Sequence, residues 1–150
     1  MTIEEQLIRE ITVGELLEEV RNKSGDGYRL VQIGCTRIED AFEINYSFDK
    51  ENRFENLRVT IGEDVTMPSI SDIYWGAFIY ENEMHDLYGI PVEGMNLDFK
   101  GNLIRTSVPH PFRGDPGEVK VKKVPVKKAE KAETKEAKKE EATADTGGEE

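Results

Sequence analysis

Hydrophobic and polar residues alternate along three successive stretches in the first half of the chain. The stretches are residues 28–35, 41–48 and 54–61, and the second of them reads AFEINYSF. A period of two is typical of strands that bury one face, and the short polar connectors between the stretches suit hairpin loops. The chain is therefore expected to contain a small antiparallel sheet with one face turned toward a core.

A helical spacing precedes these strands. Thr12 and Glu15 form a capping-box pattern, and apolar residues then recur every three or four positions until Gly25. The pattern predicts a short amphipathic helix before the first strand.

A second helical segment is predicted over residues 70–88, with a bend at Gly76. Ser69 and Asp72 supply a capping pattern at its start, and Gly89 supplies the usual left-handed stop at its end. The first half, IYWGAFIY, is apolar all round, which indicates burial. The second half carries an apolar stripe on one side and several acidic residues on the other.

Residues 92–116 have no clear period and contain scattered Gly and Pro, so we expect an extended, irregular arm lying on a surface of the protein. The remainder, residues 117–150, is rich in Lys, Glu and Ala and nearly without large apolar side chains, which predicts disorder. The expected fold class is α+β, a small antiparallel sheet packed by helices, in a domain of residues 1–116 that is followed by a tail.

The net charge of −11 lies entirely within the predicted domain, because the nine Lys of the tail balance its nine Asp and Glu. Such an acidic surface opposes binding to nucleic acid and favours a basic or mixed-charge protein partner, although solubility alone explains it equally well. The N-terminal sequence MTIEEQLIRE lacks the features of a signal peptide, and no apolar stretch approaches the length of a membrane span. We expect a cytoplasmic protein without a direct membrane span.

Residue inventory limits the chemistry that the chain could perform. Cys35 is the only cysteine, so no iron–sulfur cluster and no Cys-rich zinc site can form, and a lone cysteine on an apolar stripe is typical of core filling. Glu81, His85 and Asp86, joined by His110, form a conceivable metal site, and a small metal-dependent enzyme is one alternative. The other interpretation is a helix surface that faces a partner.

Three acids, Glu81, Glu83 and Asp86, lie within two turns of the predicted helix. Their mutual repulsion is expected to require cations, from Arg105, from Arg113 or from another protein.

The run from Glu81 to Ile90, ENEMHDLYGI, resembles a pattern of the 30-kilodalton subunit of NADH:quinone oxidoreductase (complex I), also called its C subunit. It also resembles the homologues of that subunit in membrane-bound, energy-converting [NiFe] hydrogenases of the Ech type. The opening Pro-Ser-Ile of residues 68–70, Trp75 and the segment HPFR of residues 110–113 extend the resemblance. It covers about residues 5–116.

Two departures favour the hydrogenase homologues. Asn82 stands where the family has an arginine, which removes the nearest cation from the three acids. The segment GMNLD of residues 94–98 lacks the His and Pro that the family carries there.

The resemblance implies a non-catalytic accessory subunit of an oxidoreductase complex, with no cofactor of its own. Its implied partners are a [NiFe]-hydrogenase-like large catalytic subunit and an iron–sulfur small subunit, on the cytoplasmic face of a membrane. The candidate partner-binding residues are Glu81, Glu83, Asp86, Tyr88, His110 and Arg113. The alternatives are the 30-kilodalton subunit of the quinone reductase proper and a free-standing acidic adaptor that recruits partners through its tail.

Overall fold

The computed structural model describes residues 6–114, and the predicted tail of residues 117–150 lies outside this range. The elements follow one another as β1 (Leu7–Glu10), α1 (Leu16–Gly25), β2 (Arg29–Ile38), β3 (Ala41–Lys50), β4 (Arg53–Gly62), β5 (Met67–Pro68), α2 (Ala77–Tyr88) and β6 (Val92–Glu93). The predicted α+β class is confirmed.

The three alternating stretches form an antiparallel meander, β2–β3–β4, as predicted. The strands are longer than the pattern suggested, because each hairpin connection contains only two residues. Glu51 and Asn52, which join β3 to β4, have φ values of 50° and 66°, and positive φ at both positions is typical of the turn that matches strand twist.

Strand β1 was not predicted, and it changes the character of the sheet. It pairs in parallel with β4 at the edge, so that the strand order is β1-β4-β3-β2 and the sheet is mixed rather than purely antiparallel. Its sequence, LIRE, does not alternate and all four residues are exposed, so the local pattern carries no strand signal.

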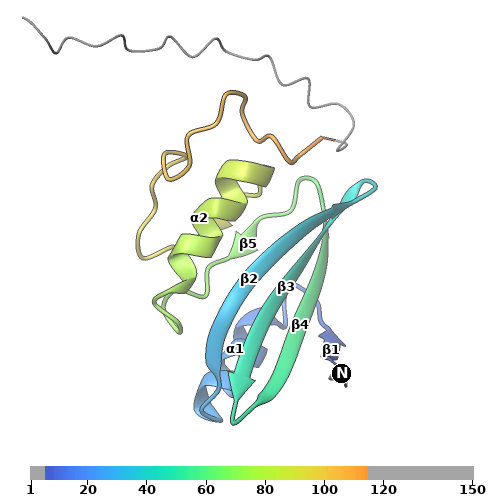
Figure 1. Ribbon diagram of the computed structural model, residues 1–150, viewed down its shortest axis with the longest axis vertical. Helices are drawn as coiled ribbons and strands as arrows, with labels where there is room; N and C mark the ends of the chain where they lie inside the picture. The colour runs from blue at the N-terminus through green and yellow to red at the C-terminus, as the bar shows by residue number, and fades with distance from the viewer. Residues whose placement is uncertain (1–5, 115–150) are drawn as a thin grey trace, which may run out of the picture. The chain divides into compact units, whose positions relative to one another are not determined.

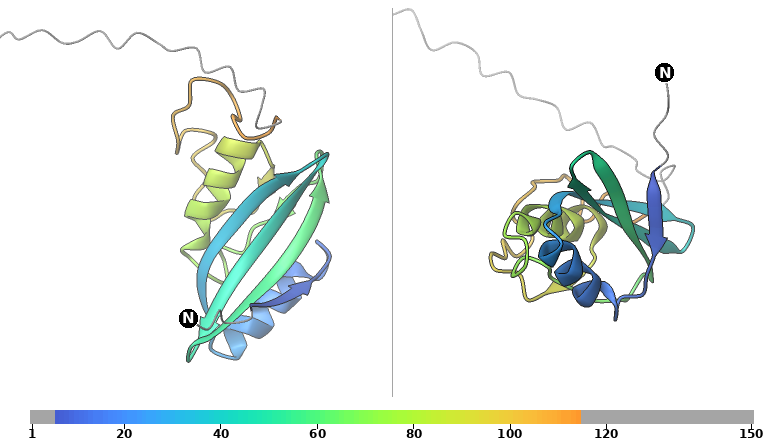
Figure 2. Two further views of the ribbon diagram at one scale, coloured as in Figure 1. Left: turned by 45° about the vertical axis from the view of Figure 1, so that its right-hand side comes forward. Right: turned by 90° about the horizontal axis from the view of Figure 1, so that it is seen from below.

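Both helices cover the same face of the sheet (Figures 1 and 2). The apolar residues of β3 on this face are buried together with Leu16 of α1 and Met84 of α2. The opposite face is polar, and there Arg58 of β4 bonds with the side chain of Asn45 at 2.9 Å. One-sided burial explains the period of two in the sequence.

The capping pattern before α1 forms in part. The Glu15 carboxylate accepts hydrogen bonds from the backbone N–H and the hydroxyl of Thr12, both at 2.8 Å. The Thr12 hydroxyl is thereby used on Glu15 and does not cap a backbone N–H of the helix.

The helix predicted over residues 70–88 is wrong in its first third. Residues 70–76 form turns, and α2 begins at Ala77. Ser69 does not cap the helix because α2 begins eight residues later. Its hydroxyl donates to Glu81 at 2.6 Å and accepts from the Ser71 N–H at 3.1 Å. The predicted stop is confirmed, since Gly89 adopts φ 71° and its N–H bonds to the His85 carbonyl at 2.8 Å.

The predicted burial of the apolar half is wrong for Trp75 and Ile79, whereas Ala77 is buried as predicted. The side chains of Trp75 and Ile79 are 63% and 48% exposed. They lie where α2 begins, beyond the edge of the packed core.

The arm is irregular, as predicted. After the short parallel pair β5–β6, residues 94–114 contain neither helix nor strand. The arm follows one side of α2 and ends near its last turn (Figure 1).

Candidate functional site

Helix α2 is fixed to the edge of the sheet by tyrosine hydroxyl groups. Strand β2 is an edge strand, and edge strands leave backbone carbonyls without a strand partner. Three tyrosines donate to such carbonyls, in the pairs Tyr74 to Tyr28 at 2.6 Å, Tyr80 to Val31 at 3.2 Å and Tyr88 to Cys35 at 2.7 Å. Tyr80 in the first turn of α2 and Tyr88 at its last residue therefore hold the helix, and Tyr74 holds the turn that precedes it.

Glu81 is the first buried acid of α2, with 1% of the residue exposed. Its carboxylate accepts a hydrogen bond from the Ser69 hydroxyl at 2.6 Å and one from the Ile70 N–H at 2.7 Å. Burial raises the pKa of Glu81, and these two hydrogen bonds oppose the rise by stabilising the ionised form. The side chain fixes the turn that leads from β5 into α2.

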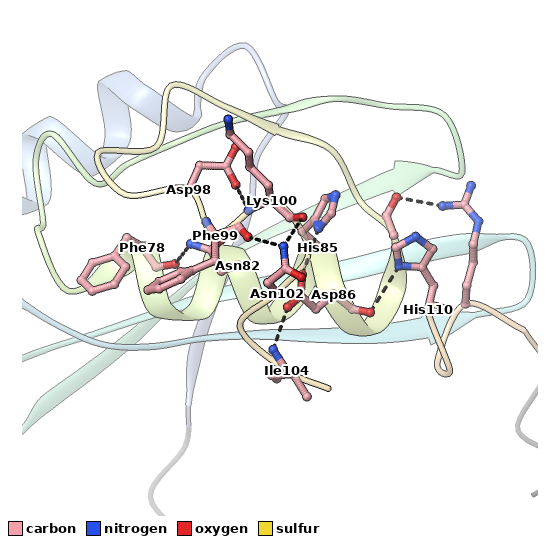
Figure 3. A network of polar contacts seen from close by, with 12 residues as sticks. Phe78, Asn82, His85, Asp86, Asp98, Phe99, Lys100, Asn102, Ile104 and His110 are labelled. Atoms are coloured by element: carbon pink, nitrogen blue, oxygen red, sulfur yellow. Dashed lines mark hydrogen bonds and ion pairs between the residues drawn. The ribbon is translucent and has the colours of Figure 1, made fainter. Parts of the chain in front are cut away.

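Asn82 joins α2 to the arm. Its amide nitrogen donates to the Phe78 carbonyl at 2.7 Å, and its amide oxygen accepts from the Phe99 N–H at 2.9 Å (Figure 3). The amide nitrogen also donates to the Leu97 carbonyl at 2.8 Å. The residue is 1% exposed. Asn82 is therefore more than a position that lacks an arginine, which corrects the interpretation from sequence. Its short amide side chain makes hydrogen bonds to the backbone of the arm.

Asp86 makes the next connection, one turn along α2. Its carboxylate accepts from the Ile104 N–H at 2.8 Å and contacts the His85 ring nitrogen at 3.1 Å (Figure 3). The Asp86 carbonyl lies 3.2 Å from Nδ1 of His110. The arm is thus held at three successive places along one side of the helix.

The end of the arm closes over the end of α2. Arg113 donates to the Gly89 carbonyl at 2.9 Å and to the Glu63 carbonyl at 3.0 Å, and the Phe112 N–H donates to the Leu87 carbonyl at 2.9 Å. A cation near the last carbonyls of a helix is favoured by the helix dipole. We call the hydrogen-bonded assembly of Asn82, Asp86 and Arg113 with the arm the clasp.

The prediction that Arg105 or Arg113 pairs with the three acids is wrong within residues 6–114. Glu81 and Asp86 are satisfied by N–H and O–H donors, Glu83 is exposed to solvent, and no salt bridge joins any of the three to an arginine of this range. Arg113 instead bonds carbonyls. The prediction failed because it assumed that the acids share an exposed face.

The metal hypothesis finds no support in the described part of the chain. No group of three or more His, Cys, Asp or Glu side chains within it is placed to bind a metal ion. The Glu81 carboxylate faces Ser69, whereas the Asp86 carboxylate faces Ile104 on the arm. Burial also raises the pKa of the Cys35 thiol to about 12, which disfavours a reactive thiolate.

The six residues predicted to bind partners fall into three groups. Glu81 and Asp86 are buried, Glu83 is exposed, and Tyr88, His110 and Arg113 are partly buried. The structure also reveals an anchor that the sequence did not indicate, because Asn96 of the arm donates two hydrogen bonds, of 2.9 and 2.8 Å, to Ser71 in the turn.

None of the helices in residues 6–114 combines the length and the apolarity that crossing a bilayer requires.

Comparison with known proteins gives consistent matches. Residues 7–120 match the model of the family described as "Respiratory-chain NADH dehydrogenase, 30 Kd subunit". The NADH-quinone oxidoreductase C subunit of Rhodopseudomonas palustris strain TIE-1 is 32% identical over 121 residues, which cover 69% of this chain and 59% of the relative. That of Agrobacterium fabrum is 33% identical over 101 residues, which cover 53% of this chain and 50% of the relative.

The chain thus spans 50 to 59% of the length of these two relatives. Among solved structures, a chain of "the membrane-bound sulfane sulfur reductase (MBS), an archaeal respiratory membrane complex" superposes with a TM-score of 0.62 at 21% identity. The match covers 75% of this chain and 69% of the other. At this identity the likeness concerns the fold.

Proposed function

Because the chain belongs to the family of the 30-kilodalton subunit of respiratory-chain NADH dehydrogenase, we propose that it is a structural, non-catalytic subunit of a membrane-bound, complex I-like oxidoreductase. The observation that carries this proposal is the extent of the family match, which includes all but one of the residues that the structure describes. The run from Glu81 to Ile90 supports the structural role in this proposal. Its buried polar side chains bond to the chain's own backbone and so hold the turn and the arm in place.

The finer proposal is that the complex is an energy-converting [NiFe] hydrogenase of the Ech type. The two sequence departures, Asn82 and residues 94–98, support this choice, and they meet in the structure where Asn82 holds the Leu97 carbonyl. In this proposal the chain docks the large catalytic subunit beside an iron–sulfur small subunit, on the cytoplasmic face of the membrane. The 30-kilodalton subunit of the quinone reductase proper is the alternative.

The predicted partner-binding residues take different parts in this proposal. Glu83 is exposed and is available to a basic side chain of another subunit. Glu81 and Asp86 act through the turn and the arm that they position, and Tyr88, His110 and Arg113 keep the end of the arm closed over α2. A partner would meet the surface that the clasp arranges.

Affinity purification from solubilised native membranes tests the proposal. A tag on the full chain is expected to recover the hydrogenase-like large subunit and the iron–sulfur small subunit in equal amounts with it. Recovery of the chain as a monomer, outside any membrane fraction, would contradict the proposal. Recovery with a quinone reductase large subunit would select the alternative complex.

Removal of residues 117–150 separates the structural subunit from an acidic adaptor. A structural subunit is expected to assemble without the tail, since the family match ends at residue 120. An adaptor that recruits partners through the Lys- and Glu-rich tail would lose them.

A further inference from the structure

An apolar surface lies exposed at the beginning of α2. The Trp75 ring stands 5.7 Å from the Phe78 ring, which stands 6.3 Å from the Phe99 ring of the arm. Ile79 lines the same groove as Trp75. Leu97, whose carbonyl accepts a hydrogen bond from Asn82, lies two residues before Phe99 on the arm. We call this surface, formed by Trp75, Phe78, Ile79, Leu97 and Phe99, the Trp75 face.

A groove continues the Trp75 face toward the sheet. It runs between the first residues of β2 and the beginning of α2, has a volume of about 690 Å³, and is lined by Tyr28, Arg29, Leu30, Val31, Tyr74, Trp75, Gly76, Ile79 and Tyr80. Tryptophan, tyrosine and arginine are the residues most enriched where protein interfaces gain their affinity.

The fold does not require this exposure. The core is completed by the buried face of the sheet with Leu16, Val20, Ala77 and Met84, and none of the five residues of the Trp75 face belongs to it. Contiguous apolar surface that is left in water is typical of interaction sites in soluble proteins.

The rim of the Trp75 face carries an excess of negative charge. Asp72, Glu83 and Asp98 are exposed around it, and Lys100 is the exposed cation beside Asp98 (Figure 3). Of the cations beside the groove, Arg29 is paired with Asp49 at 2.9 Å and Lys23 is paired with Glu55. Lys50 lies 5.8 Å from the Tyr28 ring and donates to the Asp26 carbonyl. The surface therefore combines an apolar centre with an acidic border.

We infer that the Trp75 face is a docking surface for a partner protein that presents an aliphatic or aromatic side chain flanked by lysine or arginine. This inference rests on the proposed function, in which the partner is a subunit of the same complex. The acidic border complements such a partner, because opposite charges at a rim favour encounter and register. The same border would repel a second copy of this chain, and it would repel anionic lipid head groups.

Substitution of Trp75 in the full, tagged chain tests the docking surface. Trp75→Asp is expected to lower recovery of the large subunit about tenfold or more, because it removes a central aromatic anchor and adds a charge. The matched control is Ile38→Asp, which alters an exposed apolar residue at the opposite end of β2 and is expected to leave recovery unchanged. Circular dichroism and thermal unfolding verify that both variants fold.

Charge reversal tests the acidic border separately. Glu83→Lys is expected to weaken recovery of the large subunit, with the loss growing as the salt concentration falls, because like charges then face one another. Recovery that rises with Glu83→Lys would contradict the assigned partner chemistry.

The chain offers a direct optical readout, since Trp75 is its single tryptophan. If this residue is replaced by 5-hydroxytryptophan, its fluorescence can be excited selectively in the presence of the ordinary tryptophans of other subunits. Acrylamide quenching is expected to be strong in the free chain and to fall at least about threefold in the complex, because a docked anchor is desolvated. Equal quenching in both states would overturn the inference.

The outcomes separate the two proposals. If the wild-type chain recovers no large subunit, the proposed function fails. If the wild type recovers it, but Trp75→Asp recovers as much and the tryptophan stays quenchable, the docking surface fails alone. Self-association or vesicle binding that Trp75→Asp abolishes would overturn the inference in favour of a second copy or a membrane.

Discussion

The two halves of the segment from Ile70 to Tyr88 contrast in an instructive way. The first half is apolar in sequence, yet Trp75 and Ile79 are exposed. The second half is rich in acids and amides, yet Glu81, Asn82 and Asp86 are buried. Three polar side chains of this segment are therefore buried while two of its large apolar side chains are exposed, although Ala77 and Met84 still pack in the core as a helix on a core usually does.

The contrast follows from what each half touches. The buried polar groups meet backbone N–H and C=O groups of the turn and the arm, which lack partners from regular structure and must be satisfied. The exposed apolar groups lie beyond the sheet, where no described segment covers them. The buried polar side chains thus organise the chain internally, whereas the exposed apolar ones belong to the proposed docking surface.

Among the contacts between α2 and the arm, the largest expected effect is the loss of the Asn82 amide. Asn82→Leu keeps the number and branching of the side-chain heavy atoms but leaves the Leu97 carbonyl and the Phe99 N–H without partners, which is expected to cost about 2–4 kcal/mol. Urea unfolding of the full chain measures the change. Asn102→Leu, at an exposed amide of the same arm, is the control and is expected to alter stability by less than about 0.5 kcal/mol. Equal losses of stability in the two variants would show that the buried amide of α2 matters no more than an exposed amide of the arm.

A second test concerns the end of the clasp. Gly89 has φ 71°, and a Cβ atom there would lie 2.9 Å from the His110 ring. Gly89→Ala is expected to cost about 1–3 kcal/mol from strain and displacement of the arm. Gly76→Ala, at φ −63° with no atom within 4 Å of the new Cβ, should be neutral or slightly stabilising. Thermal unfolding compares the two, and similar losses would show that the crowding at Gly89 is unimportant.

The third test uses pH. Because burial raises the folded-state pKa of Glu81 above its ordinary value of 4.5, the group is neutral and without penalty at lower pH. As the pH rises from that ordinary value through the raised pKa, the buried charge appears and this contribution to stability is lost. Glu81→Gln keeps an acceptor for the Ile70 N–H and should gain stability relative to the wild type as the pH rises.

Urea unfolding between pH 4 and pH 8 measures that difference. Glu83→Gln, at an exposed acid two residues away, is the matched control, and its difference from the wild type should stay nearly constant. A flat difference for Glu81→Gln as well would indicate that the carboxylate is solvated.

The smallest expected effect on stability is at the Trp75 face. Trp75→Ala should lower the free energy of unfolding by less than about 1 kcal/mol, because the ring is already 63% exposed. Met84→Ala, in the buried stripe of α2, should cost about 2–5 kcal/mol. Chemical denaturation compares the two, and a large loss for Trp75→Ala would show that the ring serves the fold.

Alternation sufficed to predict β2, β3 and β4, because one buried face imposes the same period on each strand. Gly89 also predicted the end of α2, because a left-handed residue after a helix needs glycine. These features depend on local sequence. The α+β class followed from them.

The failures share a dependence on distant contacts. Residues 70–76 lie outside α2, and the Ile70 N–H bonds there to Glu81, eleven positions onward, which the local sequence does not indicate. The hydrogen bonds of Asn82 could not be predicted, because the partners of its amide lie 15 and 17 positions farther along the chain. That segment has no hydrophobic period that would predict its position. Strand β1 forms by pairing with residues 55–58, which its own four residues do not indicate.

Amide hydrogen exchange, read residue by residue by NMR in the full chain, tests the central claim that the buried polar half of α2 holds the arm. The N–H groups of Phe99 and Ile104 bond to Asn82 and Asp86, whereas that of Arg105 has no partner among residues 6–114. The account predicts slow exchange at Phe99 and Ile104, despite their place in an irregular segment, and fast exchange at Arg105. Equally fast exchange at all three would show that the arm is not held, and would contradict the account.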